Sequence, residues 1–186
     1  MPRRSMFLLC AGLLLCAAIA GATTLVPLDT RALALQSQEI VVGTVESSRS
    51  YWNPGKTKIF TDVVLRVERR IKGQESERIT ITQLGGVVDG VRVRVHATPA
   101  FAVGEEALIF AAKDGRGRLQ LNGLAQGKFE IEHEGSERLV QRRTPGFAFK
   151  DARSLRAIPA GEAPARVTLD AMIAEVESIL EAEAGR

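Results

Sequence analysis

The sequence has only two cysteines, Cys10 and Cys16, and both lie close to its N-terminus. The rest of the chain therefore has no thiol that could form a disulfide, a zinc-thiolate site or a covalent intermediate. Without such cross-links, the folded domain has to be stabilised by its apolar core alone. Disulfide scaffolds and cysteine-dependent enzymes are excluded.

Histidine and aromatic residues are equally scarce, since the chain has two histidines, one tryptophan and one tyrosine. His96 falls on the polar side of an expected strand, and His133 lies between Glu132 and Glu134 at the shoulder of an expected hairpin. Successive strand residues point to opposite faces, so these three neighbours cannot converge on one metal ion. Beyond the N-terminal segment there is no nucleophile motif of the G-x-S-x-G or S-x-x-K type. We therefore expect no metal site, no cofactor and no enzymatic activity.

Long apolar runs are absent except at the N-terminus, where Arg3 and Arg4 precede a run of apolar and small residues over 6–20. The segment ends in the sequence AGA, whose small-x-small spacing is typical of a signal-peptidase site. The run is shorter than the roughly 20 residues that a membrane-spanning helix needs. We expect residues 1–22 to be a signal peptide that is cleaved after Ala22, which leaves an extracytoplasmic protein, either periplasmic or secreted.

Two alternatives stand beside cleavage of this segment. One is an uncleaved anchor, because residues 23–28 extend the apolar run. The other is a lipid anchor on Cys16, which is disfavoured because Leu15 occupies the position where a small residue is expected.

The charges of the chain are nearly balanced. The sequence has 25 basic and 22 acidic residues, and loss of Arg3 and Arg4 with the signal peptide leaves 23 basic residues. A protein this close to neutrality is not expected to bind nucleic acid or another polyanion.

Alternating apolar and polar residues dominate the middle of the chain and predict antiparallel strands joined by hairpins. The first two strands form a long hairpin, whose connection contains the turn sequence Asn-Pro-Gly at 53–55. In the segment 91–96, valines alternate with Arg92 and Arg94, as expected of an edge strand that exposes its arginine side. Expected strands cover residues 39–48, 61–71, 78–83, 91–96, 107–112, 118–122, 127–132 and 138–141.

A helix is expected on each side of the strands. The first covers 28–37, has Asp29 or Thr30 as its N-cap, and has an apolar face formed by Leu28, Ala32 and Leu35. The second covers 167–183 and is capped by Thr168. Its apolar stripe consists of Leu169, Met172, Ile173, Val176, Ile179 and Leu180. We expect this stripe to dock on the open end of a barrel; the alternative is that it binds a partner.

The order of the phrases EIVVGTVESS, FTDVVLRVERRIKG, FAVGEEALIFAAKDGRGRL and GLAQGKFEI over residues 39–131 resembles a group of uncharacterised secreted bacterial proteins. It is also similar to the netrin-like modules, including the tissue inhibitors of metalloproteinases, which are five-stranded barrels of the oligonucleotide/oligosaccharide-binding (OB) type. The resemblance implies a barrel in an extracytoplasmic setting. Those inhibitors bind the zinc of their target through an N-terminal cysteine, which the mature chain lacks, so that mechanism does not carry over.

The predicted fold is therefore mainly β: a small five- to seven-stranded antiparallel OB-like barrel with a short N-terminal helix and a C-terminal amphipathic helix. Residues 23–143 form the barrel domain with its leading helix. Residues 144–166, which are rich in Pro and Gly, form a linker, and residues 167–183 form the C-terminal helix.

The candidate ligand-binding residues are Tyr51 and Trp52, near the tip of the first hairpin, and Arg92 and Arg94, on the edge strand. Aromatic residues in a loop are candidates for recognition. The alternative is that the hairpin tip folds back and buries Trp52. The two arginines form a basic strip, which is expected to be extended by Arg66, Arg69 and Arg70.

These observations predict a secreted or periplasmic, non-enzymatic module that binds a protein or an envelope component. The alternative is an extracytoplasmic hydrolase that uses a pair of carboxylates in a barrel cleft.

Overall fold

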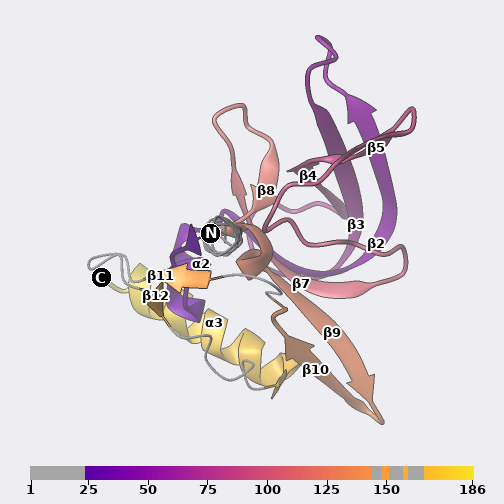
Figure 1. The fold of residues 1–186 in the computed structure, drawn as a ribbon. Helices are drawn as coiled ribbons and strands as arrows, with labels where there is room; N and C mark the ends of the chain where they lie inside the picture. Colours follow the sequence, from indigo (N-terminus) through magenta and orange to yellow (C-terminus); the bar gives the residue numbers. More distant parts are fainter. Residues whose placement is uncertain (1–23, 144–147, 151–156, 159–165) are drawn as a thin grey trace, which may run out of the picture.

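The computed structural model describes residues 24–143, 148–150, 157–158 and 166–186, so the predicted signal peptide lies outside the described residues. Its main feature is an eight-stranded antiparallel sheet, with a short helix near the N-terminal side and a longer one at the C-terminus (Figure 1). The mainly β class and the positions of both helices are thus confirmed.

The eight strands follow the order β13-β10-β9-β7-β2-β3-β4, with β8 added to β7. The three expected hairpins are present as the antiparallel pairs β2–β3, β7–β8 and β9–β10. The strands are β2 (Glu39–Trp52), β3 (Ile59–Lys72), β4 (Arg78–Leu84), β7 (Glu106–Lys113), β8 (Leu119–Leu121), β9 (Lys128–Glu134), β10 (Glu137–Gln141) and β13 (Val167–Thr168).

Two smaller sheets accompany the main one. β5 (Gly86–Val88) pairs with β6 (Val91–Val93) in a separate hairpin that contains part of the expected edge strand. A three-stranded sheet joins β1 (Thr24–Leu25), β11 (Ala148–Lys150) and β12 (Ala157–Ile158). β11 and β12 fall within the predicted linker, most of which lies outside the described residues.

β2 and β3 are long strands that bend along their length. Their pairing shifts register at three places, one of them between Val42 and Gly43, and such bulges increase the bend and twist of a strand. At Gly43 the two backbones are so close that a Cβ atom would lie 2.5 Å from the carbonyl oxygen of Arg66. Glycine is therefore required where β3 pairs closely with this part of β2.

The strands bury side chains on both faces of the bent sheet, because alternate residues of β2 and β7 point to opposite sides. On one face, Ile40, Val42 and Phe110 pack with the two helices. On the other face, Val41 and Ile109 pack inside the curl of β2, β3 and β4. Figure 1 shows both helices on the same side of the sheet.

The N-terminal helix α2 (Thr30–Gln36) begins as expected, because Asp29 accepts a hydrogen bond from the backbone N–H of Ala32 at 2.7 Å. The prediction of its buried face was wrong. The fully buried residues are Leu33 and Ala34, whereas the predicted Leu28, Ala32 and Leu35 are only partly buried. In a helix this short, the side that is covered is decided by where the sheet and the second helix lie.

The C-terminal helix α3 (Leu169–Ala184) is capped by Thr168, whose Oγ1 accepts from the backbone N–H of Ala171. The first half of its apolar stripe is buried in the helix-side core, and the second half, Ile179 and Leu180, is partly buried. The stripe therefore packs on the outer face of the sheet, and the expected docking on the open end of a barrel is wrong. No helix within the described residues is long and apolar enough to cross a membrane.

The expected barrel is not confirmed, because the sheet does not close. β4 and β8 lie on opposite sides of the opening of the curl and contact each other across it. The described residues form no hydrogen-bonded ladder between these two strands, so the sheet is curled and not closed. A one-turn 3-10 helix, η2 (Leu124–Gly127), follows β8 and lies at the same opening.

Candidate binding site

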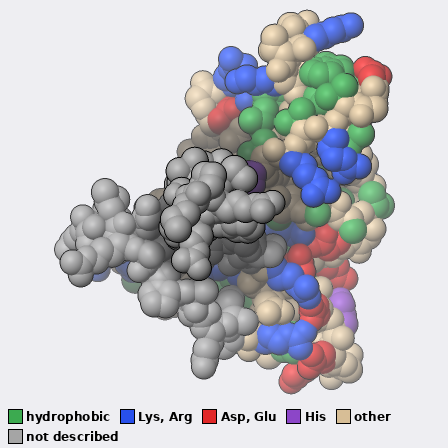
Figure 2. Space-filling view, in the orientation of Figure 1, with side chains coloured by type: hydrophobic (Ala, Val, Ile, Leu, Met, Phe, Trp, Pro, Cys, Tyr) green, Lys and Arg blue, Asp and Glu red, His purple; other side chains and the backbone are tan. Residues whose placement is uncertain are grey.

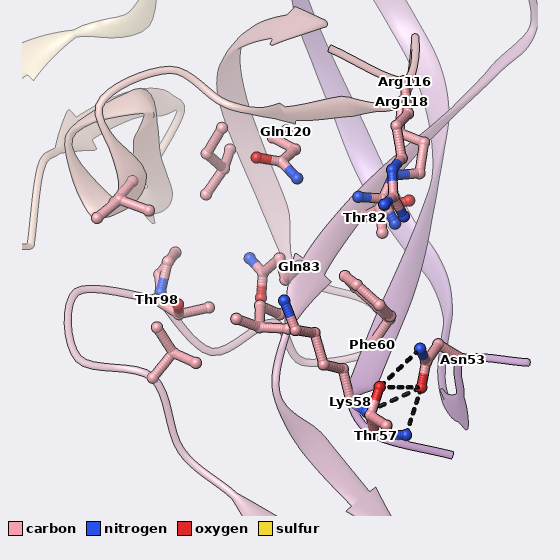
Figure 3. A pocket seen from close by; sticks show the side chains of 15 residues that line it. Asn53, Thr57, Lys58, Phe60, Thr82, Gln83, Thr98, Arg116, Arg118 and Gln120 are labelled. Atoms are coloured by element: carbon pink, nitrogen blue, oxygen red, sulfur yellow. Dashed lines mark hydrogen bonds between the residues drawn. The ribbon is translucent and has the colours of Figure 1, made fainter. Parts of the chain in front are cut away.

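The opening of the curl contains a cavity of about 600 Å³, which we call the interhairpin cavity. It is bounded by the β2–β3 turn, β4, the segment 95–99 and the β7–β8 hairpin (Figure 3). Side chains that line it include Lys58, Phe60, Gln83, Arg116, Arg118 and Leu124. A second cavity of about 830 Å³ adjoins it beneath β5 and β6.

One wall of the interhairpin cavity is the turn between β2 and β3, and it is held by Asn53. The Asn53 Oδ1 atom accepts hydrogen bonds from the backbone N–H groups of Thr57 and Lys58, each at 2.8 Å. Figure 3 shows this network at the edge of the cavity. The Asn-Pro-Gly turn expected from the sequence is therefore present, and it fixes the position from which the Lys58 side chain extends.

A second wall is built on Arg118, whose guanidinium carbon lies 4.6 Å from the centroid of the Phe60 ring. Nη2 and Nε of the same side chain donate to Asp114 Oδ2 at 2.7 and 2.9 Å. Hydrogen bonds from the backbone and then the side chain of Arg118 lower the pKa of Asp114. The charge of Arg118 is thus compensated by Asp114, and its side chain connects the β7–β8 hairpin to the β2–β3 hairpin.

Tyr51 and Trp52 lie at the end of β2, before the turn, and are directed to different places. The Tyr51 hydroxyl donates to Asp62 Oδ1 at 3.3 Å, and burial followed by the Asp62 charge raises the pKa of this tyrosine. Trp52 Nε1 donates to Asp89 Oδ2 at 3.1 Å, in the turn between β5 and β6. Both aromatic residues are partly buried, and Trp52 connects the long hairpin to the β5–β6 hairpin.

Arg92 and Arg94 lie on the β5–β6 side, where both are exposed and line the second cavity. The expected extension of this basic strip is absent. The arginines of β3 lie nearer its other end and pair with carboxylates: Arg66 with Glu46, Arg69 with Glu177, and Arg70 with Glu39. Each of these carboxylates belongs to β2 or α3, whereas the arginines belong to β3. The spacing of residues in the sequence therefore does not reveal these ion pairs.

The β5–β6 hairpin also exposes apolar side chains. Its strands pair only with each other, so the valines expected to face inward are themselves exposed. The exposed fractions are 38% for Leu84, 46% for Val87, 45% for Val91 and 36% for Val93. Figure 2 shows hydrophobic side chains beside basic ones on this part of the molecule. We call these four residues, with Arg92 and Arg94, the β5–β6 surface.

Carboxylates gather instead at a shallow third cavity of about 350 Å³, where they are neutralised by basic groups. The ammonium of buried Lys128 lies 2.5 Å from Glu105 Oε1 and 2.6 Å from the carbonyl oxygen of Ala100. Arg143 pairs with Glu130 and Glu132, in both cases at 2.7 Å. These contacts connect the segment 100–105 and the end of β10 to β9.

The two histidines contact different parts of the structure. His133 Nε2 is 3.2 Å from Glu106 Oε2, and His96 lines the second cavity. In the described ranges, no group of three or more His, Cys, Asp or Glu side chains is placed to hold a metal ion.

Sequence reasoning did not identify the interhairpin cavity. Lys58, Gln83, Arg116 and Leu124 come from four separate segments, and none of them belongs to a recognised motif. Comparison of the sequence with protein-family models finds no match, and comparison with curated proteins finds none either.

Proposed function

We propose that this chain is a secreted or periplasmic non-enzymatic binding module, and that the β5–β6 surface binds a secreted or envelope protein. The observation that carries the proposal is the exposure of aliphatic side chains on both faces of one small hairpin: Val91 and Val93 lie on one face, Val87 lies beside Arg92 on the other, and Leu84 lies next to the hairpin. Apolar side chains that are exposed together favour a role in protein association, because leaving them in water is costly.

The charges beside this surface indicate the chemistry of the partner. Within the described part of the chain, neither Arg92 nor Arg94 makes an ion pair. Arginine next to an apolar centre is typical of interfaces, where it contributes charge and contact area together. The partner we expect presents acidic side chains around an apolar contact.

The extracytoplasmic location and the OB-type barrel belong to the same proposal. The N-terminal segment has the three parts of a signal peptide. The contact between β4 and β8, with an apolar interior between them, supports a barrel of the netrin-like kind that is left open on one side. Location is tested by N-terminal sequencing of the mature protein, which should begin at Thr23; retention of Met1 on membrane-bound material would contradict it.

The alternative is a hydrolase that uses paired carboxylates. In the described residues, no Asp or Glu side chain lines either of the two larger cavities. The carboxylates of the third cavity are engaged in ion pairs with Lys128, Arg143 and Arg166. A general acid or nucleophile has to be accessible to substrate, so this arrangement favours the binding function.

The test is photo-crosslinking in cells, with a benzoylphenylalanine placed at Val91. The matched control is Val103, which is 69% exposed but lies in the loop between β6 and β7. We expect one strong cross-linked species from Val91 and none from Val103. The double substitution Arg92→Glu with Arg94→Glu should abolish that species.

Three results would contradict the proposal. They are equal cross-linking from Val91 and Val103, a cross-linked species that survives the charge reversal, or a product that contains only two copies of this chain. Circular dichroism of each variant checks that it has folded.

A further inference from the structure

We propose that the interhairpin cavity binds a small amphipathic anion, which means a compound with an apolar body and one carboxylate, sulfonate or phosphate group. This site shares Leu84 with the β5–β6 surface and is otherwise lined by different residues, and the inference does not depend on a protein partner. It rests on the size of the cavity, its apolar lining, one buried donor without a partner and two uncompensated cations.

The size and construction of the cavity suit a small molecule. Its volume of about 600 Å³ lies within the range of roughly 300 to 1,000 Å³ that is usual for such sites. Its walls are already fixed by the Asn53 network and by the stacking of Arg118 on Phe60. A ligand would therefore meet a largely preformed site, which reduces the entropy lost on binding.

Apolar side chains form part of the lining and include Phe60, Leu84, Leu121 and Leu124. Leu124 has a φ of +60° and remains 40% exposed at the cavity. A bulky residue in the left-handed region is strained, and such strain clusters at ligand sites. The strained turn is secured by a hydrogen bond of 2.9 Å from the Ala125 N–H to the carbonyl oxygen of Ala97, which itself has a φ of +71°.

Gln83 supplies a hydrogen-bond donor that the described part of the chain leaves unused. Its Nε2 atom is buried and has no hydrogen-bond partner within the described residues, although the side chain lines the cavity. A buried amide N–H without a partner is costly. An oxygen of a bound anion would satisfy it.

Lys58 and Arg116 give the cavity its charge. They come from the two opposing hairpins, and the described residues offer neither of them an ion pair, whereas Arg118 is compensated by Asp114. No carboxylate of the described chain lines the cavity to cancel them. Figure 3 shows Lys58 and Gln83 beside one open space, with Arg116 on the side of the β7–β8 hairpin. The positive charge and the free donor together favour an anionic group over a neutral one.

The experiment compares two fluorescent probes that have the same apolar body. One is 8-anilinonaphthalene-1-sulfonate, which carries a sulfonate, and the other is N-phenyl-1-naphthylamine, which is neutral. We expect the sulfonate to bind once per chain, with a Kd about tenfold below that of the neutral probe. Displacement by decanoate or by 2-naphthoate then distinguishes a chain-like natural ligand from a ring-like one.

Matched variants locate the binding. Lys58→Gln with Arg116→Gln should weaken sulfonate binding by about tenfold and leave the neutral probe unaffected. Leu124→Asn, in which asparagine tolerates the positive φ, should weaken both probes. Arg92→Gln with Arg94→Gln removes the same number of charges from the β5–β6 surface and should change neither.

The proposal is overturned if the two probes bind equally, if several molecules bind per chain, or if the Arg92 and Arg94 variant loses sulfonate binding as the cavity variant does. Displacement by neither carboxylate also overturns it. Because the sulfonate probe also binds partly folded chains, near-ultraviolet circular dichroism has to show native packing in every variant. A cavity variant without it is replaced by the single substitution Arg116→Gln, which lies in the exposed β7–β8 turn.

Discussion

The Nζ atom of Lys72 lies 2.9 Å from the carbonyl oxygen of Ala34, and 3.2 Å from that of Leu35. The last residue of β3 therefore donates to the C-terminal end of α2, where backbone carbonyls lack partners within the helix. A cation at this end also interacts favourably with the helix dipole. One side chain thus attaches the N-terminal helix to the end of the long hairpin.

We predict that Lys72→Met destabilises the protein by about 1 to 2 kcal/mol, because the carbonyl groups lose a charged donor and the methionine still fills the space. Urea unfolding followed by circular dichroism measures this loss. Lys113→Met, at an exposed position, is the control and should change the free energy of unfolding by less than about 0.5 kcal/mol. Equal effects of the two substitutions would show that Lys72 does not stabilise α2.

The ion pair between Arg70 and Glu39 is nearly buried, with side-chain exposures of 7% and 10%. Removing one partner of such a pair leaves an uncompensated charge and costs about 3 to 5 kcal/mol. We therefore predict that Glu39→Gln lowers the free energy of unfolding by about 3 kcal/mol. Glu46→Gln breaks the exposed pair with Arg78 and should cost much less, because water screens an exposed pair. The prediction fails if both variants unfold at the same urea concentration.

Gly43→Ala tests the close approach of the paired strands β2 and β3 at the bulge. The added Cβ would lie 2.5 Å from the carbonyl oxygen of Arg66, which is backbone and cannot turn away. We expect a loss of about 2 to 3 kcal/mol, as for other overpacked sites. Gly115→Ala is the matched control, because a Cβ added at Gly115 would have no other atom within 4 Å. A thermal midpoint of Gly43→Ala equal to that of Gly115→Ala would contradict this close approach.

Tyr51 is the only tyrosine of the chain, so the ultraviolet absorbance of phenolate reports its titration directly. Burial, and then the Asp62 carboxylate, raises its pKa above the ordinary value of 10.0. The folded state thus holds this proton more tightly than the unfolded state. The resulting stabilisation is complete below pH 10 and is lost as the pH rises through the pKa of the folded state. Asp62→Asn should lower the pKa of Tyr51, whereas Glu46→Gln should leave it unchanged. A wild-type midpoint at or below 10 would contradict this environment.

Local features of the fold were predictable from the sequence. The β9–β10 hairpin follows from alternation and the β7–β8 hairpin from a short continuous apolar run, each next to a glycine-containing turn, and these signals depend on residues close together in the chain. The caps of both helices, Asp29 and Thr168, were predictable for the same reason, since an N-cap hydrogen bond spans only three residues.

The candidate site was predictable only in part. The sequence singled out Trp52, Arg92 and Arg94 by residue type, and the structure connects Trp52 to the hairpin that carries both arginines. It did not indicate the interhairpin cavity, because Lys58 and Leu124 are brought together only by the curl of the sheet. The hydrogen bonds of Tyr51 and Trp52 likewise depend on the folded arrangement, because Asp62 lies on the paired strand β3 and Asp89 lies in the turn between β5 and β6.

The sequence by itself determined the longer strands, the three hairpins β2–β3, β7–β8 and β9–β10, and the helix caps, because periodicity, turn residues and capping side chains act over a few neighbouring residues. Only the tertiary structure decided that Leu33 and Ala34 are the buried side of α2, and that Arg66, Arg69 and Arg70 are neutralised by carboxylates of other elements. It also decided that the sheet curls without closing and leaves a basic, partly apolar cavity at its opening. These outcomes depend on contacts between residues far apart in the chain, whose geometry no local pattern specifies.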